Sequence, residues 1–401
     1  MYITPLFYRW TYQSHCQTIC LSASLSFPQI IYHVKNLTTF AAANSKNEEP
    51  VVLNITMERP KILVIYTGGT IGMMMDPEDK ALKPFEFKNI RQQLPMLDLL
   101  ECDITFQSLL PLIDSSDTNP QFWLRLVDMI EAEYENYDGF VVLHGTDTMA
   151  STSSALSFLL ENLDKPVIIT GSQLPLGVLR TDGRRNILNA IGFAADRRDG
   201  RPVLNEVCLF FQTALFRGNR IYKDDAASFN AFHSPNYPHL ANVGTEITYN
   251  EQYLLPRSVP DTFIAHHKMS TNVGLIKLFP GINLATMEAM LHTEGLQAVV
   301  LETFGVGNAP TSPDFLNILK DAIDRDIILV NISQCKGGGG VEMQRYATGK
   351  HLADIGVTSG SDMTTEAALT KLMYLFGEGY PLNTIRKLLK MSLRGELTEN
   401  Y

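Results

Sequence analysis

Short apolar runs recur along the chain, and longer amphipathic stretches separate them. The runs are rich in Val and Ile and show little alternation of apolar with polar residues, which is typical of strands covered on both faces. They predict buried strands at KILVIY (61–66), FVVLH (140–144), PVIIT (166–170), VCLFF (207–211), VGLIKL (273–278), AVVLE (298–302) and IILVN (327–331).

The stretches between these runs are predicted to be helices. In NPQFWLRLVDMIEAEYEN (119–136), Asn119 can cap the first turn and Pro120 fits into it. EAALTKLMYLF (366–376) and TIRKLLKMSL (384–393) have similar patterns. Because strands and helices alternate, we expect an α/β fold in which helices cover parallel sheets.

The length of 401 residues predicts two domains, because single cores stop growing near about 250–300 residues. The pattern lapses over 250–272, which contains two prolines and little periodicity, so we expect the linker there. An N-terminal domain over 57–249 and a C-terminal domain over 273–401 follow from this boundary.

Residues 1–56 differ from the rest, since aromatics, Ser, Thr and Asn mix without a sustained period of 2 or 3.6. Strong patterning begins just after Met57. We expect a poorly ordered extension, or an upstream start with Met57 as the working initiator. The alternative is a targeting segment, although its apolar part, ICLSASLSF (19–27), is short and interrupted.

Composition excludes several classes of protein. The net charge of −10 argues against a nucleic-acid partner, and no run of 18 or more uncharged apolar residues predicts a membrane span. Five cysteines, few and odd in number, predict no disulfide framework. Cys16 and Cys20 lack a second pair of ligands, and no HExxH-type spacing occurs, so we expect no required metal.

Glycine and threonine follow two predicted strands, in YTGGT (66–70) and HGTDT (144–148). Ligands of open parallel sheets bind outside the carboxyl ends of strands. Glycines there allow sharp turns and present N–H groups to a carboxylate or an oxyanion. A threonine hydroxyl needs a base to attack, so Thr146 beside Asp147 predicts an assembled site, which a partly desolvated lysine would complete.

Several of these residues also have purely structural uses. Thr67, Thr70, Thr146 and Asp147 are of types that favour helix caps. TGGTIG invites a phosphate-loop interpretation, but it lacks GxGxxG and no GK[ST] follows. CKGGGG (335–340) is interpreted as a flexible loop, and His144 as a structural hydrogen-bonding residue.

From about Lys61 onward the chain resembles the L-asparaginases of the threonine-nucleophile family, in their type I, cytoplasmic form. The resemblance implies a larger N-terminal domain with helices on both faces of its sheet, a smaller flavodoxin-like C-terminal α/β domain, and no cofactor. It rests on YTGGTIG (66–72), DSSD (114–117), DGFVVLHGTDTMA (138–150), PVIITGSQLPL (166–176), LFRGNRIYK (215–223), FGVGNAP (304–310) and LRGELT (393–398).

The resemblance also implies roles for individual residues. Thr70 corresponds to the nucleophile that attacks the side-chain amide of asparagine, which gives an aspartyl ester that water then hydrolyses. Thr146, Asp147 and Lys223 correspond to the family's Thr-Asp-Lys cluster, in which the lysine raises the basicity of the threonine hydroxyl and assists proton transfer.

The remaining implied roles concern the substrate. Ser115 and Ser116 match positions that hold its α-carboxylate side, and Asp147 matches the partner of its α-ammonium. The substrate carbonyl is expected near the Gly145–Thr146 backbone, with Gly69 also lining the site. Asn308 resembles a residue that approaches from a neighbouring subunit, which implies a homodimer or homotetramer.

One departure and three alternatives remain open. Leu82 falls where the family has a tyrosine on a mobile loop, so the acceptor of the Thr70 proton is another residue, such as Lys223 through Thr146, or the loop works without it. The alternatives are a glutaminase, an ammonia-generating subunit of a tRNA-dependent amidotransferase, and a non-catalytic amino-acid sensor.

Overall fold

The computed structural model describes residues 58–75, 82–84, 90–257 and 262–399, together with four strands nearer the N-terminus. The chain forms two compact units, Met1–Arg59 and Pro60–Tyr401. Of the helices in the described residues, none is both long and apolar enough to cross a bilayer.

The first unit contains a four-stranded antiparallel sheet, which the sequence pattern did not predict. Each strand has only four or five residues, too few to establish a period of 2 in a longer window. Met57 lies outside the described residues, so its role as an initiator stays a prediction. The strands are β1 (Thr18–Leu21), β2 (Ile30–Val34), β3 (Thr38–Ala42) and β4 (Val51–Ile55).

The second unit begins with an eight-stranded sheet in the order β19-β18-β15-β14-β11-β9-β5-β8. The five strands from β14 to β8 pair in parallel, and the other three are antiparallel. The strands are β5 (Lys61–Gly68), β8 (Asp103–Ile113), β9 (Gly139–Leu143), β11 (Val167–Thr170), β14 (Val207–Phe211), β15 (Ala214–Arg217), β18 (Ala241–Val243) and β19 (Ile247–Tyr249).

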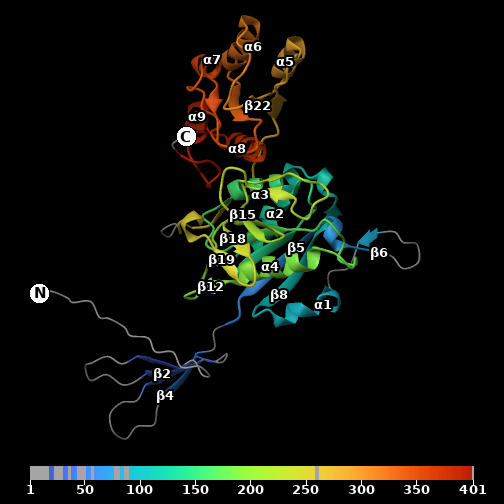
Figure 1. Cartoon of the computed structure of the whole chain (residues 1–401), viewed down its shortest axis with the longest axis vertical. Coiled ribbons are helices and arrows are strands. Elements are labelled where there is room, and N and C mark those ends of the chain that lie inside the picture. Colours follow the sequence, from blue (N-terminus) through green and yellow to red (C-terminus); the bar gives the residue numbers. More distant parts are fainter. Residues whose placement is uncertain are drawn as a thin grey trace, which may run out of the picture. The chain divides into compact units, whose positions relative to one another are not determined.

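Helices cover both faces of this sheet, as predicted. Alternate residues of β5 face opposite cores: Leu63 and Ile65 pack with α2 and α3, whereas Ile62 and Val64 pack with α4. Figure 1 shows α2 and α3 on one side of the central strands and α4 on the other. The three helices are α2 (Pro120–Ala132), α3 (Met149–Leu159) and α4 (Gly183–Ala195). The side chain of Asn119 caps α2 as expected, since its Oδ1 accepts the Phe122 N–H.

Smaller elements surround this sheet. They are α1 (Ile90–Gln93) and the paired strands β6 (Met73–Met75) with β7 (Leu82–Pro84), β10 (Leu160–Glu161) with β20 (Ile264–Ala265), β12 (Arg197–Arg198) with β13 (Arg201–Pro202), and β16 (Tyr222–Lys223) with β17 (Phe232–His233). The backbone of Leu82 pairs with that of Met75, but its side chain and the loop 76–81 lie outside the described residues.

The C-terminal part forms a smaller parallel sheet, β21-β22-β23-β24, whose strands follow the order of the sequence. Flavodoxin has the order 2-1-3-4-5, which here describes the parallel strands of the larger sheet instead. The elements are β21 (Val273–Lys277), α5 (Leu284–Leu291), β22 (Ala298–Thr303), α6 (Pro313–Asp324), β23 (Ile328–Ser333), α7 (Ala347–Ile355), β24 (Thr358–Ser359), α8 (Thr365–Gly377) and α9 (Leu382–Leu388).

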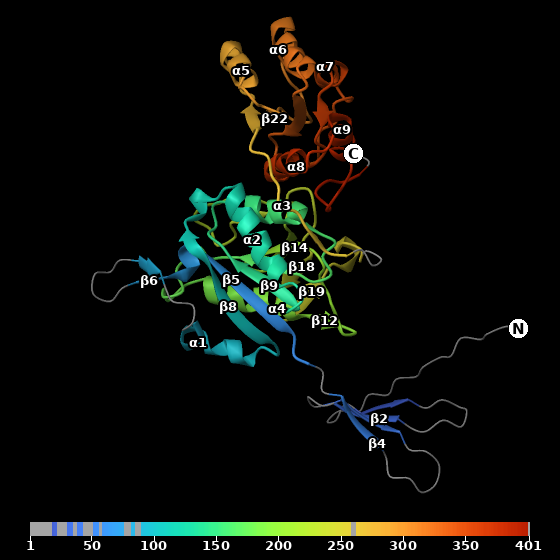
Figure 2. The same cartoon turned by 180° about the vertical axis from the view of Figure 1, so that it is seen from behind.

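Two layers of helices cover this second sheet. One face packs against α5, α6 and α7, and the other packs against α8. Figure 2 shows α8 between β22 and α3. Ser154 of α3 and Thr370 of α8 share a buried hydrogen bond of 2.9 Å between their hydroxyls, so α8 joins the two domains. The α/β fold with a larger N-terminal and a smaller C-terminal domain is confirmed.

Candidate active site

The turn after β5 lies in backbone contact with the turn after β9. Gly68 and Gly69 have φ angles of 122° and 81°, which side-chain-bearing residues rarely adopt. A Cβ atom on Gly69 would lie 2.5 Å from Cα of Gly145, so only glycine fits. Thr70 follows directly and begins a short 3₁₀ turn. The contact brings the two turns predicted from YTGGT and HGTDT to one place.

The turn after β8 completes this arrangement. A Cβ atom on Gly145 would lie 2.5 Å from Oγ of the buried Ser115, and the hydroxyl of Thr148 donates to the Ser115 carbonyl at 2.7 Å. Hydrogen bonds from the backbone and hydroxyl of Ser116 lower the pKa of the exposed Asp114 carboxyl. Three strand ends therefore meet at the point where the strand order reverses, which is where open α/β sheets bind ligands.

Lys223 joins the two polar residues of the turn after β9. Its ammonium donates to Oγ1 of Thr146 at 2.9 Å and to Oδ1 of Asp147 at 2.7 Å. The lysine side chain is 17% exposed and the Asp147 side chain 65% exposed, so solvent and ligands reach the carboxylate. The structure thus brings together three of the four predicted catalytic residues by hydrogen bonds, and places the turn that carries Thr70 beside them.

Helix capping does not explain Thr146 and Asp147. The N-cap residue of α3 is Thr148, and its side chain makes no capping hydrogen bond. The hydroxyl of Thr67 donates instead to the Leu143 carbonyl at 2.9 Å and ties β5 to β9. Gly69, not Thr70, occupies the cap position of the turn 70–72.

Gln173 belongs to the site, although it was not predicted. Its Oε1 accepts the hydroxyl of Thr146 at 3.3 Å, and its Nε2 donates to the Ser228 carbonyl at 2.9 Å. Both carboxylate oxygens of Asp182 accept the Gln173 backbone N–H, which fixes the loop after β11. The available signal was its position just after the predicted strand PVIIT.

His144 is a structural residue, as predicted. Burial lowers the pKa of its imidazole to about 4, so the ring is neutral at physiological pH. Nδ1 donates to the Gly145 carbonyl at 2.6 Å, and Nε2 accepts the hydroxyl of Thr152 at 3.0 Å. Thr152 in turn accepts the indole N–H of Trp123 at 3.0 Å. This chain of hydrogen bonds holds the Gly145 turn against α2 and α3.

Asn308 lies in the C-terminal domain, in the turn after β22. Its Oδ1 accepts the hydroxyl of Thr348 at 2.7 Å. Among the described residues of a single chain, no hydrogen bond or ion pair links it to Thr146, Asp147 or Lys223. Its approach to the site of a neighbouring subunit stays a prediction.

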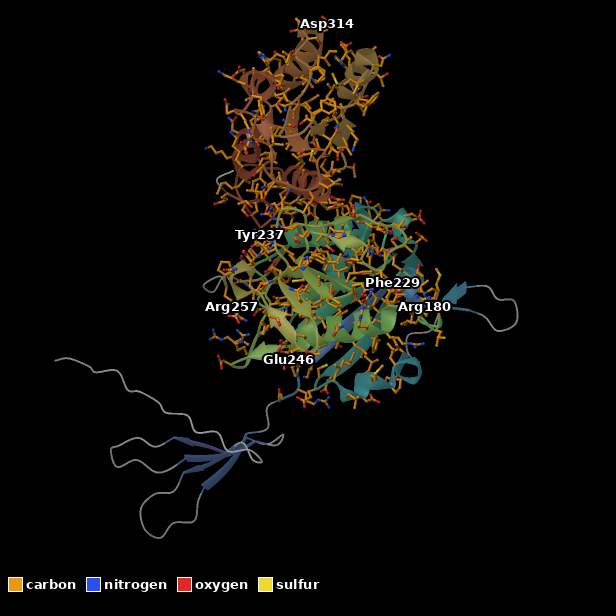
Figure 3. All side chains as sticks on the ribbon, viewed as in Figure 1. Arg180, Phe229, Tyr237, Glu246, Arg257 and Asp314 are labelled. Carbon is orange, nitrogen blue, oxygen red and sulfur yellow. The ribbon has the colours of Figure 1, made fainter. Side chains whose placement is uncertain are left out.

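Loops at the same edge surround these residues. Figure 3 shows Phe229 and Arg180 on the side of the domain where β6 lies. Cavities of about 200 and 520 Å³ lie elsewhere, one around Arg217 and Arg394 and the other around Arg198 and Arg257. The hydrogen-bonded residues, not cavity size, therefore locate the candidate site.

The comparisons with known proteins agree with this architecture. A model of the asparaginase N-terminal domain matches residues 61–254, and a model of the glutaminase/asparaginase C-terminal domain matches residues 272–389. L-asparaginase 1 of Escherichia coli K12 is 45% identical over 343 residues, which cover 85% of this chain and 99% of that protein.

Two further proteins are similar over most of this chain. The 60 kDa lysophospholipase of Mus musculus is 42% identical over 370 residues, or 84% of this chain and 62% of that protein. The solved structure of L-asparaginase I from Vibrio cholerae superimposes with a TM-score of 0.76 at 42% identity, covering 85% of this chain and 99% of that one. With both of its domains matched, this chain belongs to the asparaginase family.

Proposed function

We propose that this chain hydrolyses L-asparagine to L-aspartate and ammonia through a threonine nucleophile. Family membership and the similarity to L-asparaginase 1 support an asparaginase activity. The observation that carries the proposal is the lysine bridge from Lys223 to Thr146 and Asp147, beside the contact between Gly69 and Gly145.

In the first step, Oγ of Thr70 attacks the amide carbon of the substrate. The new C–O bond forms first and gives a tetrahedral intermediate. The C–N bond then breaks as this intermediate collapses, and the hydroxyl proton of Thr70 has to reach the departing nitrogen so that ammonia leaves. Lys223, hydrogen-bonded to Thr146, is the group that relays this proton.

The protein recognises the substrate with one carboxylate and several hydrogen-bond donors. The exposed carboxylate of Asp147 pairs with the α-ammonium of asparagine, and Ser115 and Ser116 hold the α-carboxylate side. Backbone N–H groups of the two glycine turns, at Gly69 and Gly145, stabilise the oxyanion of the tetrahedral intermediate.

In the second step, water attacks the aspartyl ester of Thr70. The water proton returns to Oγ of Thr70 through the same relay, which releases aspartate and restores the enzyme. An ester intermediate predicts that hydroxylamine competes with water and gives aspartate β-hydroxamate.

The test uses the full chain and measures ammonia released from L-asparagine and from L-glutamine. The wild type is expected to release ammonia from asparagine, whereas Thr70→Val, which keeps the side-chain shape, should lose at least about 10³-fold in kcat. Thr170→Val is the matched control, because the buried Thr170 hydroxyl donates to the Phe210 carbonyl in an adjacent strand, and it should retain turnover. A wild type that is inert on both amides contradicts the proposal.

The alternatives give different outcomes in the same experiment. A glutaminase favours glutamine, and a single methylene is worth about 1–3 kcal/mol of discrimination, so side activity is expected either way. An amidotransferase subunit releases ammonia only with a partner protein and tRNA, whereas a sensor binds asparagine without turnover. The lysine bridge, which a binding protein does not need, favours hydrolysis.

We also propose that the chain acts in the cytoplasm as a homodimer or homotetramer on a small-molecule substrate, without a cofactor. The hydrogen bond from Thr348 fixes the side chain of Asn308, which leaves its Nδ2 as a donor toward a neighbouring subunit. Sedimentation equilibrium should give a mass of two or four chains, and a monomer with full activity contradicts this part of the proposal.

A further inference from the structure

Lys223 lies on a strand of two residues, which is too short to fix its position. Among the strands of the described residues, β16 pairs only with β17, through Tyr222 with His233 and Lys223 with Phe232. The turn 217–220 leads into it from β15, and Ile221, which is 1% exposed, is the single residue between that turn and β16. Whatever fixes the turn therefore also sets the direction from which Lys223 enters the site.

Arg220 anchors this turn to the C-terminal part of the chain. Its side chain is 2% exposed and makes three contacts there. Nε donates to the Gly395 carbonyl at 2.6 Å, Nη1 to Oδ2 of Asp362 at 2.8 Å and Nη2 to Oγ1 of Thr398 at 3.2 Å. Asp362 also accepts the backbone N–H and the hydroxyl of Thr398, so the guanidinium, carboxylate and hydroxyl form one network.

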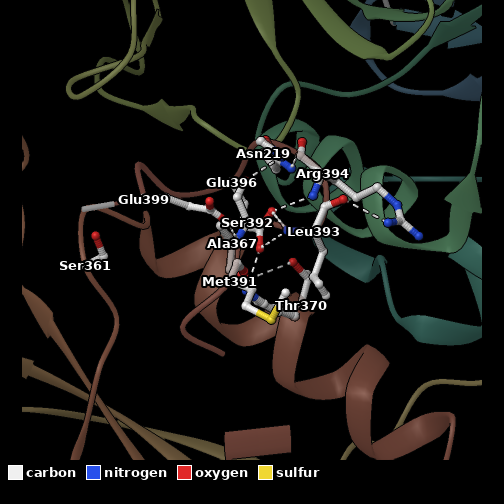
Figure 4. Close-up of polar contacts among 12 residues, drawn as sticks. Asn219, Ser361, Ala367, Thr370, Met391, Ser392, Leu393, Arg394, Glu396 and Glu399 are labelled. Atoms are coloured by element: carbon white, nitrogen blue, oxygen red, sulfur yellow. Dashed lines mark hydrogen bonds and ion pairs between the residues drawn. The ribbon is translucent and has the colours of Figure 1, made fainter. Parts of the chain in front are cut away.

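The neighbours of Arg220 contact the same segment. Nδ2 of Asn219 donates to the Arg394 carbonyl at 2.9 Å, a contact that lies within the view of Figure 4. Gly395 has a φ of +78°, and a Cβ atom there would lie 2.5 Å from Nη1 of Arg217. Three side chains of the turn therefore meet residues 394–398, about 175 positions further along the sequence.

That C-terminal segment is itself fixed by buried charges. Nζ of Lys371 on α8 lies 2.5 Å from Oε1 of Glu396, and both side chains are fully buried. Glu396 accepts the backbone N–H groups of Leu393 and Arg394, and Lys371 donates to the Met391 carbonyl at 2.6 Å. Figure 4 shows Leu393 and Arg394 close to Glu396, which accepts their backbone N–H groups. Residues 391–398 thus give the turn a rigid point of attachment.

We propose that Arg220 is a positioning residue for Lys223, and that residues 391–398 supply the surface that holds it. The inference rests on the proposed role of Lys223 in hydrolysis. If the turn 217–220 moves, Ile221 and β16 move with it, and the lysine loses its distances to Thr146 and Asp147. A displacement of about 1 Å in a catalytic group lowers turnover about 10²-fold.

The first experiment measures position without measuring activity. Hydrogen exchange of the full chain should show faster exchange in peptides spanning 218–224 for Arg220→Lys than for the wild type, because lysine cannot reproduce the three contacts. Peptides from α6 should be unchanged. Unchanged exchange over 218–224 in a folded Arg220→Lys overturns the inference, whatever the enzymatic activity proves to be.

The second experiment measures the consequence for turnover. Arg220→Lys should lower kcat for asparagine about 10–100-fold and change KM less than about threefold, because Asp147 and the serines that bind substrate are untouched. Phe315→Leu, in the core of the C-terminal domain, is the control for general destabilisation. When it is assayed at a temperature well below its melting temperature, it should have the kcat of the wild type.

A double-mutant cycle separates positioning from folding. In a Lys223→Met background, Arg220→Lys should lower the residual kcat less than twofold, because the group it positions is already gone. If the effects of the two substitutions on kcat multiply in the double mutant, the inference is overturned. If Arg220→Lys does not fold, the pair Arg220→Met with Asp362→Leu removes both charges and serves in its place, because it leaves no buried charge unpaired. A wild type without amidase activity contradicts the proposed function alone, since the exchange result stands independently.

Discussion

Lys223 is the residue on which the proposed chemistry depends, because its side chain, alone among the residues that the structure describes, hydrogen-bonds to the side chains of both Thr146 and Asp147. Lys223→Met should keep asparagine binding within about threefold and lower kcat about 10²–10⁴-fold, the usual contribution of a positioned acid or base. Steady-state kinetics and isothermal titration calorimetry measure the two effects.

The matched control for that substitution is Lys165→Met. Lys165 is also a partly buried lysine, but it donates to the carbonyls of Tyr134 and Tyr137, away from the site. It should keep kcat while losing some stability. Equal activity of Lys223→Met and the wild type would exclude the lysine as a base.

Gly69 gives a second prediction for a single residue. Gly69→Ala places a Cβ atom 2.5 Å from Gly145 and should separate the two turns, with loss of activity and about 2–4 kcal/mol of stability. Gly281 has a similar φ of 85°, but a Cβ atom there would have no atom within 4 Å. Gly281→Ala should therefore lower stability only through backbone strain, by about 1–2 kcal/mol. Thermal melts and ammonia release compare the variants; identical effects would mean that the contact between the turns is unimportant.

A site residue could be predicted where its neighbours in the sequence indicate its place in the fold. Thr146, Asp147 and the glycine turns follow apolar runs directly, so their place at the strand ends could be predicted from the sequence. Gln173 also follows an apolar run, but an uncharged amide does not by itself indicate a functional role. The network from Trp123 through Thr152 to His144 depends on the packing of α2 against α3, which no local pattern encodes.

Among the elements, the buried strands could be predicted and the strands toward the sheet edges could not. β5, β9, β11 and β14 are covered on both faces and are therefore continuous apolar runs. β8 is an edge strand whose residues are mostly exposed or half-buried, and polar residues break its apolar run. The antiparallel strands β15, β18 and β19 have only three or four residues each, which is too short for a periodic signal.

The stretch between the domains contains a pH-sensitive contact at His266. Its Nε2 lies 2.8 Å from Glu161 of β10 and its Nδ1 lies 3.4 Å from Glu378, while Arg394 and Tyr374 also face this cluster. The hydrogen bond with Glu161 raises the pKa of the imidazole and lowers that of the carboxyl. The charged pair therefore stabilises the fold between these two pKa values.

We predict that His266→Gln lowers the free energy of unfolding by about 1–3 kcal/mol near pH 5–6. The part that follows from the raised imidazole pKa is lost as the pH rises through that pKa, and the part that follows from the lowered Glu161 pKa is lost as the pH falls through it. The difference between the variant and the wild type should therefore shrink at alkaline pH. Urea unfolding at several pH values measures the difference. His292→Gln, at a half-exposed contact with Asp321, is the control, and a pH-independent difference for His266→Gln would contradict the prediction.

At the scale of the whole molecule, the presence of two domains could be predicted from the length of the chain, whereas the linker over 250–272 stays a prediction. The contact between the turn 217–220 and residues 391–398 could not be predicted, because no local pattern indicates that two motifs about 175 positions apart meet in the fold. The same holds for the buried charges Lys371 and Glu396, which sequence patterns assign to the surface.

This buried pair gives a prediction about the stability of the whole molecule. Lys371→Met should cost about 3–5 kcal/mol, because it leaves the Glu396 carboxylate buried without a counter-ion. Adding Glu396→Gln should recover most of this loss, since the amide oxygen still accepts the backbone N–H groups of Leu393 and Arg394.

Urea midpoints measure this effect, and Lys320→Met serves as the control. Lys320 forms an exposed pair with Asp324 one helical turn away, so its loss should change stability by less than about 0.5 kcal/mol. If Lys371→Met lowers stability as little as Lys320→Met does, the buried pair has no stabilising role.

The hydrogen bond between Arg220 and Thr398 spans 178 positions of the sequence and so bears on how the protein matures during synthesis. A ribosome adds about 5–20 residues per second, so the first domain emerges about 10–40 s before the segment that its Arg220 requires. During that interval the nascent sheet can collapse, but the guanidinium has no native partner. We therefore expect the contacts of Arg220 to form only after residues 394–398 have been synthesised.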